Sequence, residues 1–294
     1  MSAQPQIADV ESLPTPDWSA IALPDTWVDR LNPANPLHLL KIISRMCGKH
    51  RAVEIPIELP GRDRIPKYLL QEFHGLPNGN YSKRITRGYL TGFDRTMLGS
   101  MGDGRQRIAA QLAGCSRVLD AGCGGGRTAR ALKDSGIGEV WGLDPSPYLL
   151  QHAANDHPGI RFVQGLAEAT DFESQYFDGI AVCFLLHELP PRYMQRALAE
   201  FNRILTPGGR VAICEPSPLQ LRLNAWQLFR RFGLKGVYFR CLARALHEPF
   251  VDAWHRTDTA ALFQRYGFEV IEDHAAMPLR HFLLRKIHTL QETV

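Results

Sequence analysis

The sequence predicts an α/β fold in which an open, mostly parallel sheet carries helices on both faces. Short apolar runs alternate with amphipathic segments from residue 105 onward, a pattern typical of parallel strands joined by crossover helices. A glycine-rich turn directly follows the first apolar run. Several runs also end at an acidic residue, at the edge of such a sheet where ligands bind. These observations place a candidate site at the carboxyl ends of the strands.

The glycine-rich turn lies in residues 116–130. An apolar run ends at Asp120, glycines follow at Gly122, Gly124 and Gly126 among others, and a helix-compatible segment covers residues 127–133. Glycine lets a ligand lie close to the backbone, because no Cβ holds it away. Arg127 stands where the dinucleotide fingerprint GxGxxG needs its last glycine. Asp120 would repel a pyrophosphate but suits a cation such as an amino-acid ammonium; a turn that binds nothing is the simpler alternative.

The next strand supports a nucleoside ligand. Residues 140–143 form an apolar run that ends at Asp144, about twenty residues past the glycines, where a carboxylate can accept both hydroxyl hydrogens of a ribose. The remaining order is predicted as helix, strand, strand, helix and strand, over residues 147–154, 160–164, 179–183, 191–205 and 210–214.

These ordered motifs, with the turn Leu205-Thr-Pro-Gly-Gly209 before the fifth strand, resemble the class I S-adenosylmethionine-dependent methyltransferases. The closer likeness is to the small-molecule branch that includes the ubiquinone and menaquinone biosynthesis enzymes, and it covers residues 105–287. The resemblance implies a Rossmann-like, seven-stranded sheet that ends in strands over residues 268–271 and 281–286, the latter antiparallel. It also implies methyl transfer from S-adenosylmethionine to a small, largely apolar acceptor, such as a quinone, polyketide, sterol or lipid.

The same resemblance suggests roles for the residues of the turn. Gly122, Gly124 and Gly126 would allow close approach of the methionine and ribose parts of the donor. Asp120 would lie near the ammonium, and Asp144 would hold the ribose. Because the sulfonium is already a strong electrophile, the enzyme mainly has to orient donor and acceptor.

The loop after the third strand departs from the family pattern. Relatives often carry an acid directly after the glycine at position 165, where this chain has Leu166. We therefore expect the adenine against Leu166 and Ala167, with help from Glu168.

Two further strand ends supply candidate reactive groups. Cys183 ends the fourth strand and should border the donor site, and His187 in the following loop is a candidate base for proton transfer. The alternative is that His187 only packs against the donor or caps the loop. Glu215 ends the fifth strand and could face the acceptor. No motif for a metal site or for a nucleophilic triad accompanies these residues.

The first hundred residues lie outside the resemblance. Residues 1–24 are rich in proline and polar residues and predict a flexible arm. Residues 25–104 predict a helical cap, with helices over residues 35–48, 66–74 and 81–97 and an extended piece over residues 53–59. Aromatic residues recur every four positions in the last of these helices. Two interpretations are open. These aromatic side chains pack in the hydrophobic core, or Tyr81 and Tyr89 line the acceptor cavity.

Residues 218–247 contain six arginines and lysines before His247, no acid, and interleaved aromatic residues. We interpret residues 218–256 as a lid insertion within a methyltransferase domain that spans residues 105–294. The segment is a lid only, a lid that also touches an anionic membrane surface, or a nucleic-acid surface. The last is disfavoured, because no RNA-recognition motif accompanies it.

Composition bounds the remaining possibilities. The net charge of +4 is mild, and no apolar run approaches the roughly 18–20 residues of a membrane span. The N-terminus lacks a secretory pattern, and the six cysteines contain no CxxC pair. We therefore expect a cytoplasmic protein with free thiols, which contacts membranes at most peripherally.

Two other classes of function remain as alternatives. One is a nucleotide-linked oxidoreductase on the same sheet, which Arg127 and Asp120 disfavour. The other is a non-catalytic binding protein of this fold on a membrane surface. The identity of the acceptor, the methylated atom and the oligomeric state cannot be derived from the residues.

Overall fold

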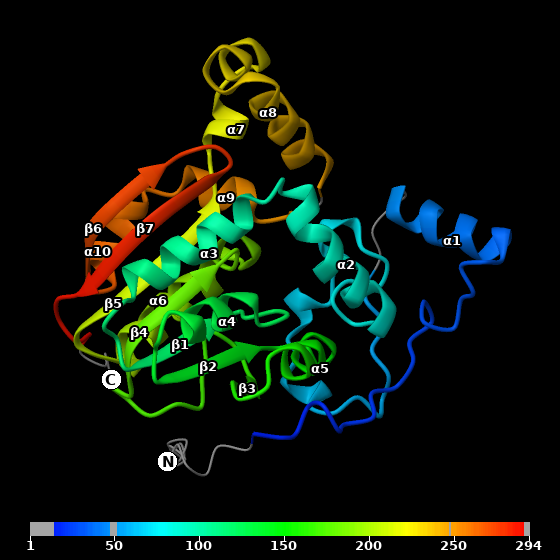
Figure 1. Ribbon diagram of the computed structural model, residues 1–294, viewed down its shortest axis with the longest axis horizontal. Coiled ribbons are helices and arrows are strands. Elements are labelled where there is room, and N and C mark those ends of the chain that lie inside the picture. The colour runs from blue at the N-terminus through cyan, green and yellow to red at the C-terminus, as the bar shows by residue number, and fades with distance from the viewer. Residues whose placement is uncertain (1–14, 48–51, 247, 291–294) are drawn as a thin grey trace.

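The computed structural model describes residues 15–47, 52–246 and 248–290. Its core is a seven-stranded sheet in the order β3-β2-β1-β4-β5-β7-β6. The first five strands run parallel, and β7 is antiparallel to both β5 and β6. The predicted fold class is confirmed (Figure 1). The strands are β1 Arg117–Ala121, β2 Glu139–Asp144, β3 Arg161–Gln164, β4 Phe177–Cys183, β5 Leu205–Pro216, β6 Phe268–Ala275 and β7 Leu279–Lys286.

Alternate side chains of the central strands enter two separate hydrophobic cores. In β1, Val118 belongs to one core and Leu119 to the other; in β2, Val140 and Trp141 divide in the same way. This two-residue period arises because successive strand side chains point to opposite faces. Both faces of the sheet are therefore covered.

Helices on the two faces complete these cores. One face carries α3 Ser100–Gln111, α4 Arg127–Asp134 and α5 Pro147–Asp156. The other carries α6 Pro191–Ile204, α9 Val251–Arg256 and α10 Thr259–Arg265. α3 begins before the domain boundary that we predict at residue 105.

The part of the predicted flexible arm that the structure describes is packed against the sheet. The predicted arm covers residues 1–24, and residues 1–14 lie outside the described residues. Trp18 is buried, and its indole Nε1 donates a hydrogen bond to the carbonyl oxygen of Phe162 at 3.0 Å. Gln151 also binds the carbonyl oxygen of Ile21 at 2.6 Å. Burial of the large Trp18 side chain holds this segment in place despite its proline-rich composition. The prediction of a flexible arm is therefore wrong for residues 15–24.

Two of the three helices that we predict before residue 100 are present, as α1 Pro36–Cys47 and α2 Lys83–Thr96. The predicted helix over residues 66–74 is wrong. The chain forms short 3₁₀ turns instead, η2 Arg62–Arg64, η3 Lys67–Leu69 and η4 Phe73–Gly75, and His74 has a φ of 58°. The extended piece over residues 53–59 forms no strand; Ala52 makes one isolated bridge to Gln71, and Pro56 has no N–H to extend it.

The predicted lid begins with α7 Leu219–Arg222 and α8 Ala225–Ala245. Figure 1 shows these helices projecting from the top of the sheet. Gly233 interrupts α8 with φ 63° and ψ −154°. Among the described residues, no helix combines the length and the apolar character needed to cross a bilayer.

Candidate active site

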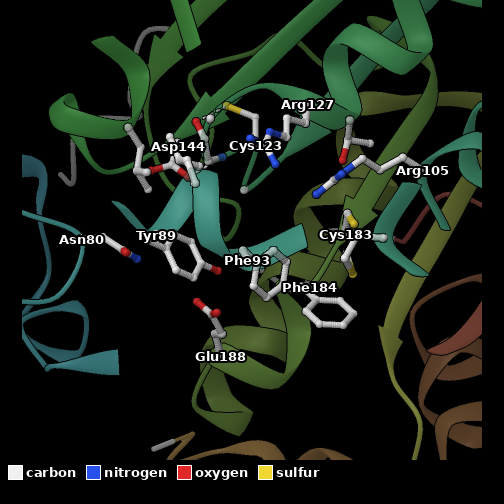
Figure 2. Close-up of a pocket in the computed structure, with 17 residues that line it drawn as sticks. Asn80, Tyr89, Phe93, Arg105, Cys123, Arg127, Asp144, Cys183, Phe184 and Glu188 are labelled. Atoms are coloured by element: carbon white, nitrogen blue, oxygen red, sulfur yellow. Dashed lines mark hydrogen bonds between the residues drawn. The ribbon is translucent and has the colours of Figure 1, made fainter. Parts of the chain in front are cut away.

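A cavity of about 110 Å³ lies at the carboxyl ends of β1, β2 and β4. Strand order reverses between β1 and β4, which is where open α/β sheets bind ligands. α2 and α3 close the cavity from the side of the N-terminal region, and Figure 2 shows Tyr89, Phe93 and Arg105 pointing into it. The volume is below the roughly 300 Å³ of a typical small-molecule pocket, so this cavity matches only part of a nucleoside.

The glycine-rich turn forms one wall. Gly122 and Gly124 line the cavity as predicted. Gly124 has a φ of 52°, which disfavours other residues. Gly125 has a different constraint, which the sequence pattern did not reveal: a Cβ there would lie 2.6 Å from the Leu90 side chain of α2. The turn is therefore open to a ligand on one side and closely covered on the other.

Gly126 has a different position. It does not line the cavity, and a Cβ there would lie 2.9 Å from the ring of Phe162. Its small size serves the packing of α4 against β3 and α5. The predicted contact of Gly126 with the donor is not reproduced.

Asp120 also lies outside the cavity lining. It is fully buried, its Oδ2 accepts the amide hydrogen of Ala129 in the first turn of α4 at 2.8 Å, and burial raises its pKa to about 7. The carboxyl group therefore fixes the start of α4 against β1. Its predicted contact with an ammonium group stays a prediction.

Asp144 lines the cavity as predicted (Figure 2). Its Oδ2 accepts the amide hydrogen of Gly124 and its Oδ1 that of Ser146, each at 2.9 Å. Burial raises the pKa of Asp144 to about 7. Each oxygen has a second lone pair, so the carboxylate can still accept the two hydroxyls of a ribose. The residues present thus fit the ribose part of a nucleoside.

Two arginines that are not among the predicted site residues face the same cavity. Arg105 from α3 and Arg127 from α4 both bind Asp94, Arg105 through two nitrogens at 2.8 and 2.9 Å and Arg127 at 2.7 Å. Burial would raise the pKa of Asp94, but the two guanidinium groups lower it. Two cations share one anion, so this group of three side chains carries a net positive charge, while Asp144 and Glu188 are the acidic residues of the same cavity wall. This arrangement suits a ligand carboxylate.

The predicted adenine contacts lie outside this cavity. Neither Leu166 nor Ala167 lines it, and Ala167 belongs to a hydrophobic core. Residues 61–68 cover the loop after β3: the Tyr68 hydroxyl binds Glu168 at 2.5 Å, and Gln164 binds the carbonyl oxygen of Gly61 at 3.1 Å. An N-terminal segment, which carries no pattern of the family, therefore covers this part of the predicted donor site.

Cys183 lines the cavity as predicted, but His187 and Glu215 lie behind it. η5 Leu186–Glu188 follows β4. Both side chains are fully buried, and His187 Nδ1 lies 2.5 Å from Glu215 Oε2. Glu215 also accepts the amide hydrogens of Leu185 and Leu186 at 3.0 and 2.8 Å. Glu215 therefore holds the loop and orients the imidazole, and the prediction that it faces the acceptor is wrong.

The second ring nitrogen of His187, Nε2, is in a different environment from Nδ1. Nε2 is buried with no hydrogen-bond partner among the described residues, and Glu248 Oε1 lies 4.0 Å away. Burial alone would lower the pKa of His187, but Glu215 raises it to about 9. The imidazole is thus held in one orientation, and Nε2 can accept a proton only in the fraction of molecules in which the ring is neutral.

His74 joins this group from the N-terminal region. Its Nε2 lies 3.3 Å from Glu188 and 3.7 Å from Glu248, and its ring stacks on Tyr89. Burial would lower the pKa of His74, but Glu188 raises it above its ordinary value. One imidazole therefore connects the cap, the loop after β4 and the segment after α8.

A second cavity, of about 30 Å³, lies beneath α8 and has a mainly apolar lining. Phe93 and Phe184 line both cavities, and their rings meet edge to face with centroids 5.8 Å apart. Phe239, Leu242 and Leu246 contribute the α8 side. Two phenyl rings therefore separate a polar cavity from an apolar one.

The aromatic stripe of α2 divides between two environments. Tyr89 lines the polar cavity, whereas Tyr81 is buried in a cluster with Val53, Ile65 and Tyr148. Its neighbour Asn80 lines the cavity instead. Tyr81 is thus ordinary core, whereas Tyr89 lines the polar cavity and not the apolar one; its contact with the acceptor stays a prediction.

Comparison with known proteins agrees with this geometry. A model of the methyltransferase domain matches residues 118–209. An uncharacterized methyltransferase of Synechocystis sp. is 32% identical over 160 residues, which are 54% of this chain and 69% of the relative. A 2-phytyl-1,4-naphthoquinone methyltransferase of Thermosynechococcus vestitus is 32% identical over 174 residues, 53% of this chain and 74% of the relative. A demethylmenaquinone methyltransferase of Staphylococcus carnosus is 29% identical over 183 residues, 57% and 75% of the two chains.

A solved structure shows the same fold. A candidate O-methyltransferase from Nostoc punctiforme superposes with a TM-score of 0.52 at 19% identity, over 66% of this chain and 59% of that one. The oxidoreductase alternative finds no support in these comparisons. The chain belongs to the class I S-adenosylmethionine-dependent methyltransferases, in the branch that contains the demethylmenaquinone enzymes, and S-adenosylmethionine is its methyl donor.

Proposed function

We propose that this enzyme methylates a quinone-like aromatic acceptor that carries an apolar substituent. The observation that carries the proposal is the pair Phe93 and Phe184, which borders a polar cavity on one side and an apolar cavity on the other. The polar lining of the first matches part of a charged donor, and the apolar lining of the second, of about 30 Å³, matches an apolar substituent in chemistry but must widen to admit it. The relatives named for demethylmenaquinone and phytylnaphthoquinone support the same class of acceptor.

On the donor side, Gly122 and Gly124 allow close approach of the methionine and ribose parts, and Asp144 accepts the ribose hydroxyls. Arg105 and Arg127 attract the carboxylate of the methionine part. Bound S-adenosylmethionine supplies an electrophilic methyl group: the acceptor atom forms a bond to the methyl carbon as the carbon–sulfur bond breaks. The phenyl rings of Phe93 and Phe184 exclude water from this border.

Methylation of an acceptor carbon or oxygen releases a proton, which a base must accept. We propose His187 Nε2, because Glu215 fixes the ring and Nε2 has no hydrogen-bond partner within the described part of the chain. A pKa of about 9 leaves His187 protonated at neutral pH. Proton removal through Nε2 should therefore become faster as the pH rises toward 9.

In this proposal the methyltransferase domain is covered by two segments, one over the donor and one over the acceptor. Residues 25–104 cover the donor, residues 105–294 form the methyltransferase domain, and α8 within the insertion of residues 218–256 covers the acceptor. Residues 218–247 also contact an anionic membrane, from which an apolar acceptor is drawn. The enzyme would then work from the cytoplasmic face as a peripheral protein.

The test is methyl transfer from isotopically labelled S-adenosylmethionine to reduced naphthoquinones with short and long apolar chains. Mass spectrometry should find one labelled methyl group per acceptor, with faster turnover for acceptors that carry an apolar chain. The variant Asp144→Ala serves as the negative control. Label transferred to none of these acceptors, but to a polar metabolite of a host extract, would contradict the proposal.

A further inference from the structure

Helix α1 presents its apolar side outward. Leu39, Leu40, Ile43 and Met46 lie along one side at helical spacing and are 43–62% exposed. The less exposed side carries His38, Ile42 and Arg45. A surface helix normally buries its apolar stripe against the core. This inverted arrangement leaves an apolar helix face without a partner in the described part of the protein.

The polar side of α1 is attached to the body. Arg45 binds Glu72 at 2.8 Å, and both side chains are largely buried. Lys41 and Arg45 each lie 5.4 Å from the ring centroid of Trp27. These contacts fix which side faces inward, so the outward direction of the apolar stripe is built into the packing.

The start of α8 has the same character. Trp226 and Phe229 stack on each other, and Leu234 is exposed beyond them. Arg230, Arg231 and Lys235 alternate with these side chains and are exposed too. Figure 1 shows α8 and α1 standing outside the helices that cover the sheet, α8 at the top of the view and α1 at its right.

The charged residues of α1 and α8 indicate which kind of partner covers their exposed apolar faces. Neither α1 nor α8 contains an aspartate or a glutamate. The exposed cations Arg230, Arg231 and Lys235 lie beside the apolar side chains of α8, whereas the cations of α1, Lys41 and Arg45, contact Trp27 on its inward side. Exposed apolar side chains beside cations, without acids, complement a bilayer surface of anionic lipid. A protein partner would not require the exclusion of acids from both helices.

Both helices adjoin the covered site. α1 is bound to Glu72, two residues before His74, and His74 reaches Glu188 and, after α8, Glu248. The later part of α8 lines the apolar cavity with Phe239 and Leu242. Both helices are therefore linked by contacts to the walls of the two cavities.

We infer that α1 and the start of α8 form one two-point docking surface for an anionic lipid bilayer, with both contacts linked to the cavity walls. The inference rests on the proposed membrane contact of residues 218–247 and adds α1 as a second anchor. Two linked contacts hold a bilayer more tightly than one, because the second forms at a high effective concentration once the first is made. α1 therefore determines both how tightly the protein binds and how its cavity faces the lipid.

The test is flotation of the full chain with vesicles of phosphatidylcholine, with and without phosphatidylglycerol. Wild type should float with the anionic vesicles only. Leu40→Ser with Ile43→Ser in α1 should lower the partition coefficient about tenfold or more, because two apolar side chains no longer enter the bilayer. Trp226→Ser with Phe229→Ser should have a similar effect. Ile57→Ser, at a side chain that is 79% exposed outside both helices, is the matched control and should float as wild type does.

Methyl transfer to a short-chain, water-soluble naphthoquinol separates this inference from the proposed function. The α1 variant should retain wild-type turnover with that acceptor and lose it only with vesicle-borne acceptor. Flotation of the α1 variant equal to wild type would overturn the inference, even if transfer occurs. So would a loss of dimer in sedimentation velocity caused by the α1 changes, because a second copy of the chain would then cover this face.

Discussion

The two cavities on either side of Phe93 and Phe184 differ in almost every respect. The polar cavity is built from strand ends, with Asp144, Arg105 and Glu188 in its wall, and charges there are held by backbone amides or by ion pairs. The apolar cavity takes Phe239, Leu242 and Ala243 from α8, and its wall is mainly apolar, with Gln220 and Glu248 as its polar residues. In the proposed function, this difference assigns the donor to the strand ends and the acceptor to the side of the insertion.

The border itself is held under strain. Phe184 has a φ of 59°, unusual for a bulky residue, and its amide donates to the carbonyl oxygen of Cys214 at 2.9 Å. Such residues persist only where the surroundings fix them, and they concentrate at functional sites. The backbone after β4 thus aims one ring at the junction of the two cavities.

His187 lies behind this border, and its removal should have the largest effect. His187→Ala should lower kcat about 10²- to 10⁴-fold, the usual contribution of a positioned base, while the affinity for S-adenosylhomocysteine stays unchanged. The measurement pairs steady-state kinetics with calorimetry. His187→Gln retains a group that can bind Glu215 but cannot accept the proton, and should be equally slow. Unchanged kcat in both variants would remove the proposed base.

The same imidazole should make stability depend on pH. The folded pKa of about 9 lies above the unfolded value of about 6.5. The protonated pair with Glu215 therefore stabilises the fold fully below pH 6.5, and that contribution is lost as the pH rises through 9. Its size is about 3 kcal/mol from the shift. Thermal melts of wild type and His187→Gln should converge as the pH is raised; a constant difference from pH 6 to 10 would contradict this dependence.

The donor side can be disrupted alone at Asp144. Asp144→Ala removes a charged acceptor for the ribose and leaves the Gly124 amide unpaired, so affinity for S-adenosylhomocysteine should fall about 10- to 100-fold. Calorimetric titration measures it directly. Glu139→Ala, at the other end of β2, is the matched control. Equal affinities of the two variants would show that the donor is held elsewhere.

The acceptor side can be disrupted alone within α8. Leu242→Ser lines the apolar cavity with a polar group and should raise KM for a long-chain acceptor about tenfold, with donor affinity unchanged. Leu234→Ser, on the exposed part of the same helix, should leave KM for a detergent-solubilised acceptor as in wild type. An equal rise in KM for the two variants would mean that the substitutions in α8 only destabilise the protein.

Strand-end acids show how far the sequence predicts the site. Asp144 and Glu215 both end a strand, and only Asp144 also has the spacing of about twenty residues from the glycines that is typical of a ribose contact. Asp144 lines the cavity, whereas Glu215 is occupied by backbone amides and by His187. Whether Glu215 faces a ligand depends on the course of the neighbouring loop, which a local pattern does not encode.

Residue periodicity predicted the strands and crossover helices of residues 105–216, and the family resemblance implied the seven-stranded sheet with its antiparallel last strand. Arg105, His74 and Glu248 could not be found in this way, because helix α3 and two irregular segments bring them to the site from separate parts of the chain. Arg127 did carry a signal, as the residue that breaks the dinucleotide fingerprint. The packing of Trp18 shows the same limit, since its partner Phe162 is distant in sequence.

A crystal structure with S-adenosylhomocysteine and a naphthoquinone bearing a short apolar chain tests the division between the two cavities most directly. We expect the sulfur atom beside the turn of Gly122 and Gly124 and the apolar chain beneath α8, with the rings of Phe93 and Phe184 at the junction. A naphthoquinone bound among Asp144, Arg105 and Arg127, or a sulfur atom on the α8 side of the two phenyl rings, would contradict it.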